Sequence, residues 1–287
     1  MKSKVIEIIG PPGAGKSTIY QSLCRNWESG SQWVYPEMLL ANKPSLLSVK
    51  SWLWYKMRLL LHKKPAKTVP VDYGMRFDAH QQLLAKFCWK HLSDNSFYED
   101  NETNKRFRSA YFLFTTFCIY QAIIEKAAAK PCIIEEGLLQ RSFLIKDNDA
   151  DDEPAKELLH EYLRLVPLPY AIIYIDTPDT SEVVKRLRGR SKVIASHFGK
   201  DDDALRRNIE KWRKIQENIL ENMKASGVAI IRINGKLPVK DNVAQIKKML
   251  ETLGDNPGAE ETNTVNTTIR HPLKAIKHIT RILFNNL

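Results

Sequence analysis

The apolar residues of this chain fall into short, nearly continuous runs, and longer segments with helical spacing separate these runs. Five segments have the length and β-branched content of strands: 5–9, 32–37, 131–137, 170–176 and 228–234. Four further segments repeat apolar residues at helical spacing: 109–130, 180–190, 203–224 and 239–253. Runs without polar alternation are typical of strands buried on both faces. The order of elements therefore predicts an α/β fold, a three-layer sandwich whose central parallel sheet of about five strands has helices on both faces.

The first run leads directly into a glycine-rich turn and a helical segment. Residues 10–17 match G-x-x-x-x-G-K-[ST] at every fixed position. Glycines let backbone N–H groups surround a phosphate, and the following helix directs the positive end of its dipole toward it. Lys16 would reach the β- and γ-phosphates, and Ser17 would bind Mg²⁺. The predicted ATP-binding residues are Gly10, Pro11, Pro12, Gly13, Ala14, Gly15, Lys16, Ser17 and Thr18.

Acidic side chains stand at the carboxyl ends of predicted strands, where α/β proteins bind their ligands. Glu37 is a candidate general base or anchor for an acceptor hydroxyl, and a helix-entry acid is the alternative. Glu135 would hold a magnesium-bound water, with Glu136 as the alternative ligand. Asp176 is interpreted mainly as a turn and cap residue, with a role near the adenine left open.

These motifs resemble the thymidylate kinase and deoxynucleoside kinase branch of the P-loop kinases over residues 3–253. Besides the phosphate loop, the resemblance is carried by a strand ending in Glu (34–37), a strand-terminal acid followed by an arginine (133–142), a strand leading into an arginine-bearing lid (175–190), and a terminal strand–helix pair beginning at 233–235. In this chain several residues separate the acid and the arginine of 133–142, and residues 40–108 match no part of the family pattern. The resemblance implies ATP- and Mg²⁺-dependent phosphoryl transfer.

Arginines provide the remaining candidate catalytic groups. Arg186 and Arg190 are four residues apart, so both could face the phosphates. The resemblance to a lid implies this role for at least one of Arg186, Arg188 and Arg190. A basic helix exposed to solvent would show the same spacing. Arg141 would hold an acceptor phosphate or hydroxyl, and the pair 106 and 108 could either assist it or simply be solvated at a helix start.

Charge is distributed unevenly along the 287 residues, which carry 44 Lys+Arg against 33 Asp+Glu and a net charge of +11. The 43% hydrophobic content excludes a disordered or collagen-like chain. Residues 38–71 contain seven Lys or Arg and no acid, and residues 270–287 contain four and no acid. The charge therefore predicts two basic surfaces that contact anionic partners, on a body whose charges otherwise nearly cancel.

Residues 46–61 have an amphipathic helical pattern in which tryptophan and lysine alternate. An anionic membrane surface across 46–67, an acceptor contact and a core helix over the sheet all fit this pattern, and nucleic acid fits it least well. Residues 254–270 are polar and aperiodic, as in a flexible linker. They precede a basic amphipathic helix at 271–287 that either docks on the body or lies on an anionic membrane.

The predicted organisation is a P-loop kinase-like domain at 1–253, followed by this linker and tail helix. The domain would contain a helical acceptor or cap insertion at about 40–108 and a lid at about 186–202. The four cysteines show no CxxC pair, and the longest uncharged stretch, 109–124, is 16 residues long and predicts a buried helix. Without a signal peptide at residue 1, we expect a cytoplasmic protein, with peripheral binding at the inner face of the membrane as an alternative. A homodimer is left open.

The expected function is ATP-dependent transfer of the γ-phosphoryl group to a hydroxyl or phosphate of a small acceptor, as in nucleoside and nucleotide kinases. One alternative is a kinase for a sugar, glycan or lipid-linked acceptor at the membrane surface. A second is a nucleotide-gated binding or signalling protein without transfer chemistry. A P-loop sulfotransferase is least favoured, because its donor loop does not normally require the full G-K-S signature.

Overall fold

The computed structural model describes residues 3–28, 30–40, 48–60, 70–93, 103–127, 130–142, 153–190 and 199–255. Within these residues, four strands form one all-parallel sheet in the order β2-β1-β3-β4. The strands are β1 (Val5–Ile9), β2 (Cys132–Ile134), β3 (Ala171–Asp176) and β4 (Ala229–Asn234). The predicted α/β class and parallel sheet are confirmed.

The described sheet has four strands rather than about five, because the predicted strand at 32–37 does not form. Only Val34 makes a bridge to β2, through Cys132, and Pro36 begins the short helix α2 (Pro36–Leu40). Proline lacks a backbone N–H and has a fixed φ suited to the first helical position, so the ladder ends and a helix starts there. Glu37 consequently lies in a first helical turn and not at the end of a strand.

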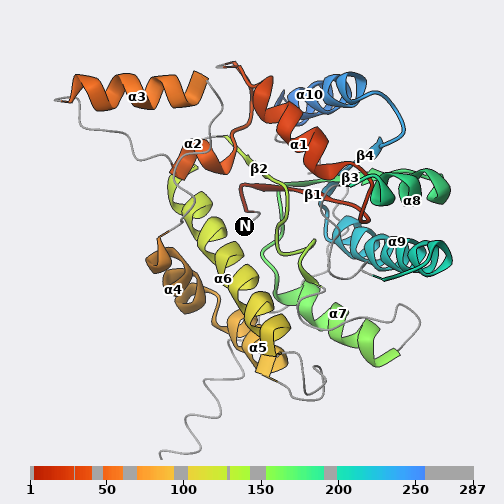
Figure 1. Cartoon of the computed structure of the whole chain (residues 1–287). Helices are drawn as coiled ribbons and strands as arrows, with labels where there is room; N and C mark the ends of the chain where they lie inside the picture. The colour runs from red at the N-terminus through yellow and green to blue at the C-terminus, as the bar shows by residue number, and fades with distance from the viewer. Residues whose placement is uncertain are drawn as a thin grey trace, which may run out of the picture. The chain divides into compact units, whose positions relative to one another are not determined.

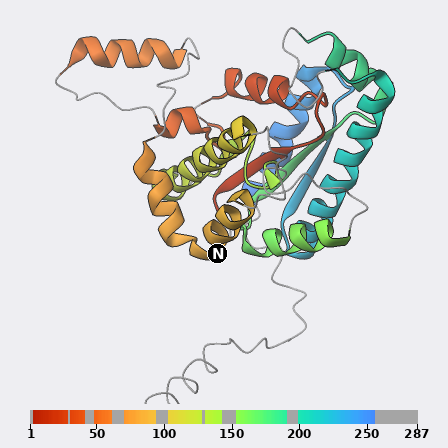
Figure 2. The ribbon, with the colours of Figure 1, turned by 60° about the horizontal axis from the view of Figure 1, so that its bottom comes forward.

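Helices lie on both faces of the sheet, as expected (Figure 1). One face carries α1 (Lys16–Arg25) and α10 (Val239–Asp255), which are joined by a hydrogen bond from Lys247 Nζ to the carbonyl of Asn26. The other face carries α6 (Thr103–Lys126), α7 (Glu153–Leu165) and α9 (Asp202–Ala225), whose buried side chains share a core with those of the strands. Figure 2 shows the same layers from another side. This arrangement explains why all of β1 is buried.

The interval 40–108, which matched no family pattern, is mainly helical in its described residues. It contains α3 (Val49–Leu60), α4 (Val71–His80), α5 (Gln82–Ser93) and the start of α6. The helix α4 packs on α6 through stacked rings of Phe77 and Phe117, whose centroids are 4.7 Å apart. The predicted lid at about 186–202 begins in the last turn of helix α8 (Thr180–Arg188), and residues 191–198 lie outside the described residues.

By length and composition alone, residues 106–126 of α6 could cross a membrane. In the structure, Leu113, Phe117, Tyr120 and Ile123 of this helix are buried in the core that contains β1, β2 and β3. A core helix meets the same criterion of length and composition, and a buried helix is what the uncharged stretch 109–124 predicted.

The chain divides into two compact units, Met1–Glu251 and Thr252–Leu287. The helix α10 extends to Asp255, slightly beyond the predicted domain end at 253. The rest of the predicted linker, and the whole predicted tail helix at 271–287, lie outside the described residues.

Candidate nucleotide-binding site

The phosphate loop connects β1 to α1 at the carboxyl end of the sheet. Gly13 has a left-handed φ of 87°, and a Cβ at this position would lie 2.7 Å from Cγ1 of Val183 in α8. Only glycine therefore fits both the backbone conformation and the space between the loop and α8. The helix α1 begins at Lys16, so its free N–H groups and positive dipole end are directed at the loop.

The side chain of Lys16 is hydrogen-bonded to the backbone of the phosphate loop. Its ammonium donates hydrogen bonds to the carbonyls of Gly10 and Pro11. Burial lowers the pKa of Lys16 to about 8, Glu136 and Glu135 raise it in opposition, and Arg190 lowers it further. These effects show that both predicted acids of the β2 end and one predicted lid arginine lie near the ammonium.

Arg141 follows the β2 end and lies beside the same acids. It forms an ion pair with Glu136, with Nη2 and Oε2 2.7 Å apart, and its guanidinium lies 5.0 Å from the ring centroid of Phe112 in α6. Burial lowers the pKa of Arg141, and the neighbouring carboxylates oppose this. Its Nε is buried and has no hydrogen-bond partner among the described residues. This side chain therefore retains a donor for an anionic or polar ligand.

A residue that the sequence analysis did not single out, Glu7, anchors the loop that carries Arg141. Its carboxylate is fully buried in β1 and accepts hydrogen bonds from the Tyr120 hydroxyl and from the amides of Leu139, at 3.0 Å, and Gln140, at 3.4 Å. A Cβ at Gly137 would lie 2.2 Å from its carboxyl carbon, so the loop approaches this closely only with glycine there. The signal for Glu7 was an acid within an otherwise apolar strand.

The pKa of Glu7 reflects this environment. Burial raises it to about 7, although the hydrogen bonds from Tyr120, Leu139, Gln140 and Leu138 all lower it. Desolvation of the carboxylate thus outweighs its hydrogen bonds.

Gln140 connects this anchored loop to the phosphate loop. Its Oε1 accepts a hydrogen bond from the amide of Gly10 at 3.0 Å and a second from Nε2 of Gln216 in α9 at 3.4 Å. The Tyr162 hydroxyl of α7 also donates to the carbonyl of Leu138 at 2.8 Å. The segment 137–141 is therefore attached to β1, α7, α9 and the phosphate loop, and this fixes where Glu136 and Arg141 lie relative to Lys16.

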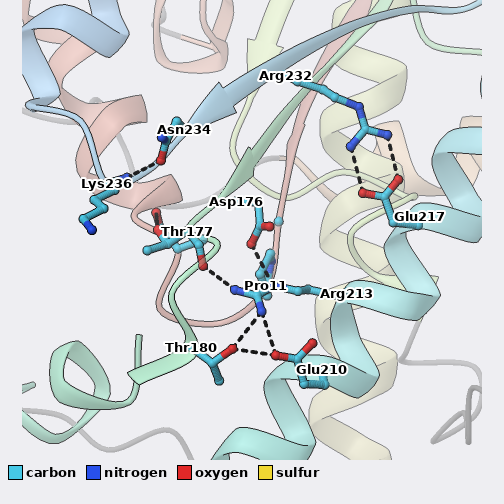
Figure 3. Close-up of polar contacts among 12 residues, drawn as sticks. Pro11, Asp176, Thr177, Thr180, Glu210, Arg213, Glu217, Arg232, Asn234 and Lys236 are labelled. Carbon is cyan, nitrogen blue, oxygen red and sulfur yellow. Dashed lines mark hydrogen bonds and ion pairs between the residues drawn. The ribbon is translucent and has the colours of Figure 1, made fainter. Parts of the chain in front are cut away.

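The carboxyl end of β3 is organised by Arg213 of α9, a second residue that the sequence analysis did not single out (Figure 3). Its guanidinium donates to Asp176 at 3.0 Å, to the Thr180 hydroxyl at 2.8 Å, to Glu210 at 2.7 Å and to the carbonyl of Thr177. Asp176 is thus an ion-pair partner and not the cap of α8.

The cap of α8 is Asp179, whose side chain accepts hydrogen bonds from the amides of Ser181 and Glu182. It follows the Thr-Pro pair at 177–178, so a cap in this turn was expected but was assigned three residues too early.

The three candidate lid arginines point to different partners. Arg186 donates to Glu182 at 3.1 Å, to the Thr177 hydroxyl at 3.3 Å and to the carbonyl of Gly235 at 3.1 Å, which ties α8 to the loop after β4. Arg188 is paired with Asp202 at the start of α9. The helix ends at Arg188, so Arg190 lies beyond it and influences Lys16 from there.

Glu37 is held against the body of α1. The Tyr20 hydroxyl donates to its Oε2 at 3.1 Å. Burial raises the pKa of Cys132, and the charge of Glu37 adds to this effect. Tyr20 is one helical turn beyond Lys16. In the described chain, Glu37 therefore contacts the second turn of α1.

Residues 106 and 108, predicted just ahead of the buried helix, lie inside α6, with the first half-buried and the second exposed. Among the described residues, no group of three or more His, Cys, Asp or Glu side chains could hold a metal ion alone. A nucleotide-bound Mg²⁺ needs only one or two protein oxygens besides phosphates and water. The exposed Ser17 hydroxyl and Glu135 near Lys16 fit that smaller donor set.

Comparison with solved structures finds a likeness in fold. No protein-family model matches the chain, and no curated protein sequence is significantly similar to it. A solved structure of deoxyadenosine kinase from M. mycoides with bound dATP matches with a TM-score of 0.42 and 15% sequence identity, covering 86% of this chain and 98% of that chain. At this level of similarity, the likeness says nothing about activity or substrate. The fold rests on the sheet order and the phosphate loop described above.

Proposed function

We propose that this protein is an ATP-dependent phosphotransferase of the nucleoside- or nucleotide-kinase type. One observation carries the proposal: Glu136 and Arg141 form an ion pair on a loop that Gln140 connects to the amide of Gly10 in the phosphate loop. The charges of Glu136, Glu135 and Arg190 also act on the pKa of Lys16. Phosphoryl transfer depends mainly on positioning and charge neutralisation, and this group supplies charges of both signs.

Each of these residues has a role in the proposed reaction. The loop amides and Lys16 would bind the phosphates of ATP, with the ammonium exchanging its bonds to Gly10 and Pro11 for bonds to phosphate oxygens. Arg190 would neutralise charge on the transferred group. A bound Mg²⁺, held by Ser17 and Glu135, would add further positive charge.

The acceptor would bind beside Arg141. Its guanidinium and the Phe112 ring lie together, so they offer a cation and a flat apolar surface at one place. A nucleoside or nucleotide presents a ring and a hydroxyl or phosphate, and it would use both. Glu136, paired with Arg141, would orient that guanidinium. A nucleotide-gated switch without transfer would have little use for such a pair next to the phosphate loop.

The test is ATP consumption with Mg²⁺ in the presence of nucleosides, nucleoside monophosphates, sugars or core glycans. We expect consumption that depends strictly on an added nucleoside or nucleotide and that is lost in Lys16→Ala. Lys86→Ala, which removes an exposed lysine of α5, serves as the control and should keep full activity. Full activity of Lys16→Ala would refute the mechanism. Phosphorylation of only a sugar or glycan would refute the acceptor class.

A further inference from the structure

The helix α3 exposes large apolar side chains to solvent. Val49 is 76% exposed, Leu53 64%, Trp54 52%, and Trp52 and Met57 41% each. Every side chain of α3 that the structure describes is exposed. Soluble surfaces rarely gather so many apolar groups within one short helix without a partner for them.

Cations are interspersed with these apolar groups on the same faces. Val49, Trp52, Leu53 and Lys56 follow the i, i+3, i+4, i+7 spacing of one helical face. The Lys56 ammonium lies over the Trp52 ring, 5.0 Å from its centroid, so the contact is present in the structure as well as in the spacing. Lys50 is a second exposed cation of the helix.

The sequence offers no acid to neutralise these cations locally, because residues 38–71 contain seven Lys or Arg and no Asp or Glu. A second copy of α3 would therefore bring like charges together. An apolar groove on a protein would bury Lys56 with Trp52 and Leu53 and leave its charge unpaired. A nucleic acid would pair with the lysines but would leave Val49 and Leu53 in water.

We propose that α3 binds the surface of an anionic lipid bilayer. The headgroup layer is the one environment that accepts indole rings, aliphatic side chains and lysine ammonium groups side by side. Each cation near an anionic membrane surface strengthens the attraction, and salt screens this attraction over a Debye length of roughly 8 Å at physiological ionic strength. Binding through α3 would hold the protein at the membrane whatever reaction its phosphate loop supports.

The experiment uses the full chain with vesicles of phosphatidylcholine alone and vesicles that contain phosphatidylglycerol, separated by flotation. We expect binding to the anionic vesicles at least about tenfold stronger than to the neutral ones, weakening as salt is raised. Lys50→Gln with Lys56→Gln should lower the partition coefficient about tenfold or more. Lys86→Gln with Lys90→Gln, which removes two lysines of α5, is the matched control and should change it less than threefold.

A second measurement separates α3 from the tail at 271–287. Brominated lipids quench tryptophans that enter the headgroup region, and the chain beyond residue 255 contains no tryptophan. We expect quenching that is lost when Trp52→Phe and Trp54→Phe are combined. Binding without quenching, equal binding to both kinds of vesicle, or the same partition for the Lys50/Lys56 variant would each refute the proposal.

Discussion

Glu7 illustrates how one side chain connects a strand to a site. It stands in the middle of β1, opposite Ile134 of β2 and Ile172 of β3, where every neighbouring residue of its own strand is apolar. Its carboxylate gives the loop after β2 an acceptor for two backbone amides. A buried amide without an acceptor would cost roughly 1–3 kcal/mol, so the acid stabilises that loop conformation despite its own desolvation.

Glu7 should make the stability depend on pH. Its pKa is about 7 in the folded protein against 4.5 ordinarily, so between these values the folded state binds more protons than the unfolded state. The free energy of unfolding should therefore fall as pH rises from about 5 to about 8, by up to about 3 kcal/mol. In Glu7→Gln this component should disappear. Urea unfolding of both proteins at several pH values measures this component. The same change of the free energy of unfolding with pH in both proteins would contradict the prediction.

Replacing Gln140 should weaken nucleotide binding more than replacing Gln216, its hydrogen-bond partner in α9. Gln140→Leu would leave the buried amide of Gly10 without an acceptor, and we expect ATP to bind about tenfold more weakly. Gln216→Leu removes the other hydrogen bond of Gln140 and keeps the one to the phosphate loop, so its effect should be less than threefold. Titration with a fluorescent ATP analogue compares the two. Equal losses would show that the network acts as one unit.

At the scale of elements, two arginine ion pairs connect the long helix α9 to the sheet (Figure 3). Arg213 on α9 reaches Asp176 at the end of β3 and Thr180 at the start of α8. Arg232 on β4 pairs with Glu217 on α9 through two hydrogen bonds. The two pairs differ in burial, since the Arg213 side chain is 14% exposed and that of Arg232 is 56% exposed.

This difference predicts unequal costs. Arg213→Ala should lower the free energy of unfolding by about 2–4 kcal/mol, because it leaves Asp176 and the carbonyl of Thr177 partly buried without their donor. Arg232→Ala removes an exposed pair and should cost about 1 kcal/mol or less. Denaturant unfolding measures both, and the idea fails if Arg232→Ala is the more damaging change.

At the scale of the whole molecule, the parallel order β2-β1-β3-β4 brings four strand ends to one edge. At these ends lie the phosphate loop after β1, the acids after β2, Asp176 as the last residue of β3, and Gly235 after β4. The loop after β2 reaches the phosphate loop because their strands are adjacent, and Arg186 links the ends of β3 and β4. Ligand binding at this edge would therefore stabilise several parts of the fold together.

Mg²⁺–ATP should accordingly raise the temperature of unfolding. At a concentration 100 times its Kd, a ligand adds about 2.7 kcal/mol, which corresponds to about 5 °C or more for a chain of this size. Lys16→Ala should lose most of this increase, and Lys86→Ala should retain it. Thermal unfolding followed by circular dichroism provides the measurement. A full increase in Lys16→Ala would show that the nucleotide binds elsewhere.

The sequence by itself determined the elements whose signals are local. Glycine spacing and a following helix specify the phosphate loop at 10–17, and continuous apolar runs specify four parallel strands, because these patterns depend on backbone geometry over a few residues. The same local logic failed at 32–37, where Pro36 favours a helix start over a strand end.

Only the tertiary structure decided which side chains meet. It tied Arg186 to Thr177 and Gly235 and let the charge of Arg190 act on Lys16. It also directed Glu37 to Tyr20 and enclosed Glu7 between α6 and the loop after β2. These outcomes depend on strand order, on where α8 ends and on how α6 crosses the sheet. The contacts of Glu7 with Tyr120 and of Gln140 with Gly10 join residues more than one hundred positions apart, and no short pattern in the sequence records them.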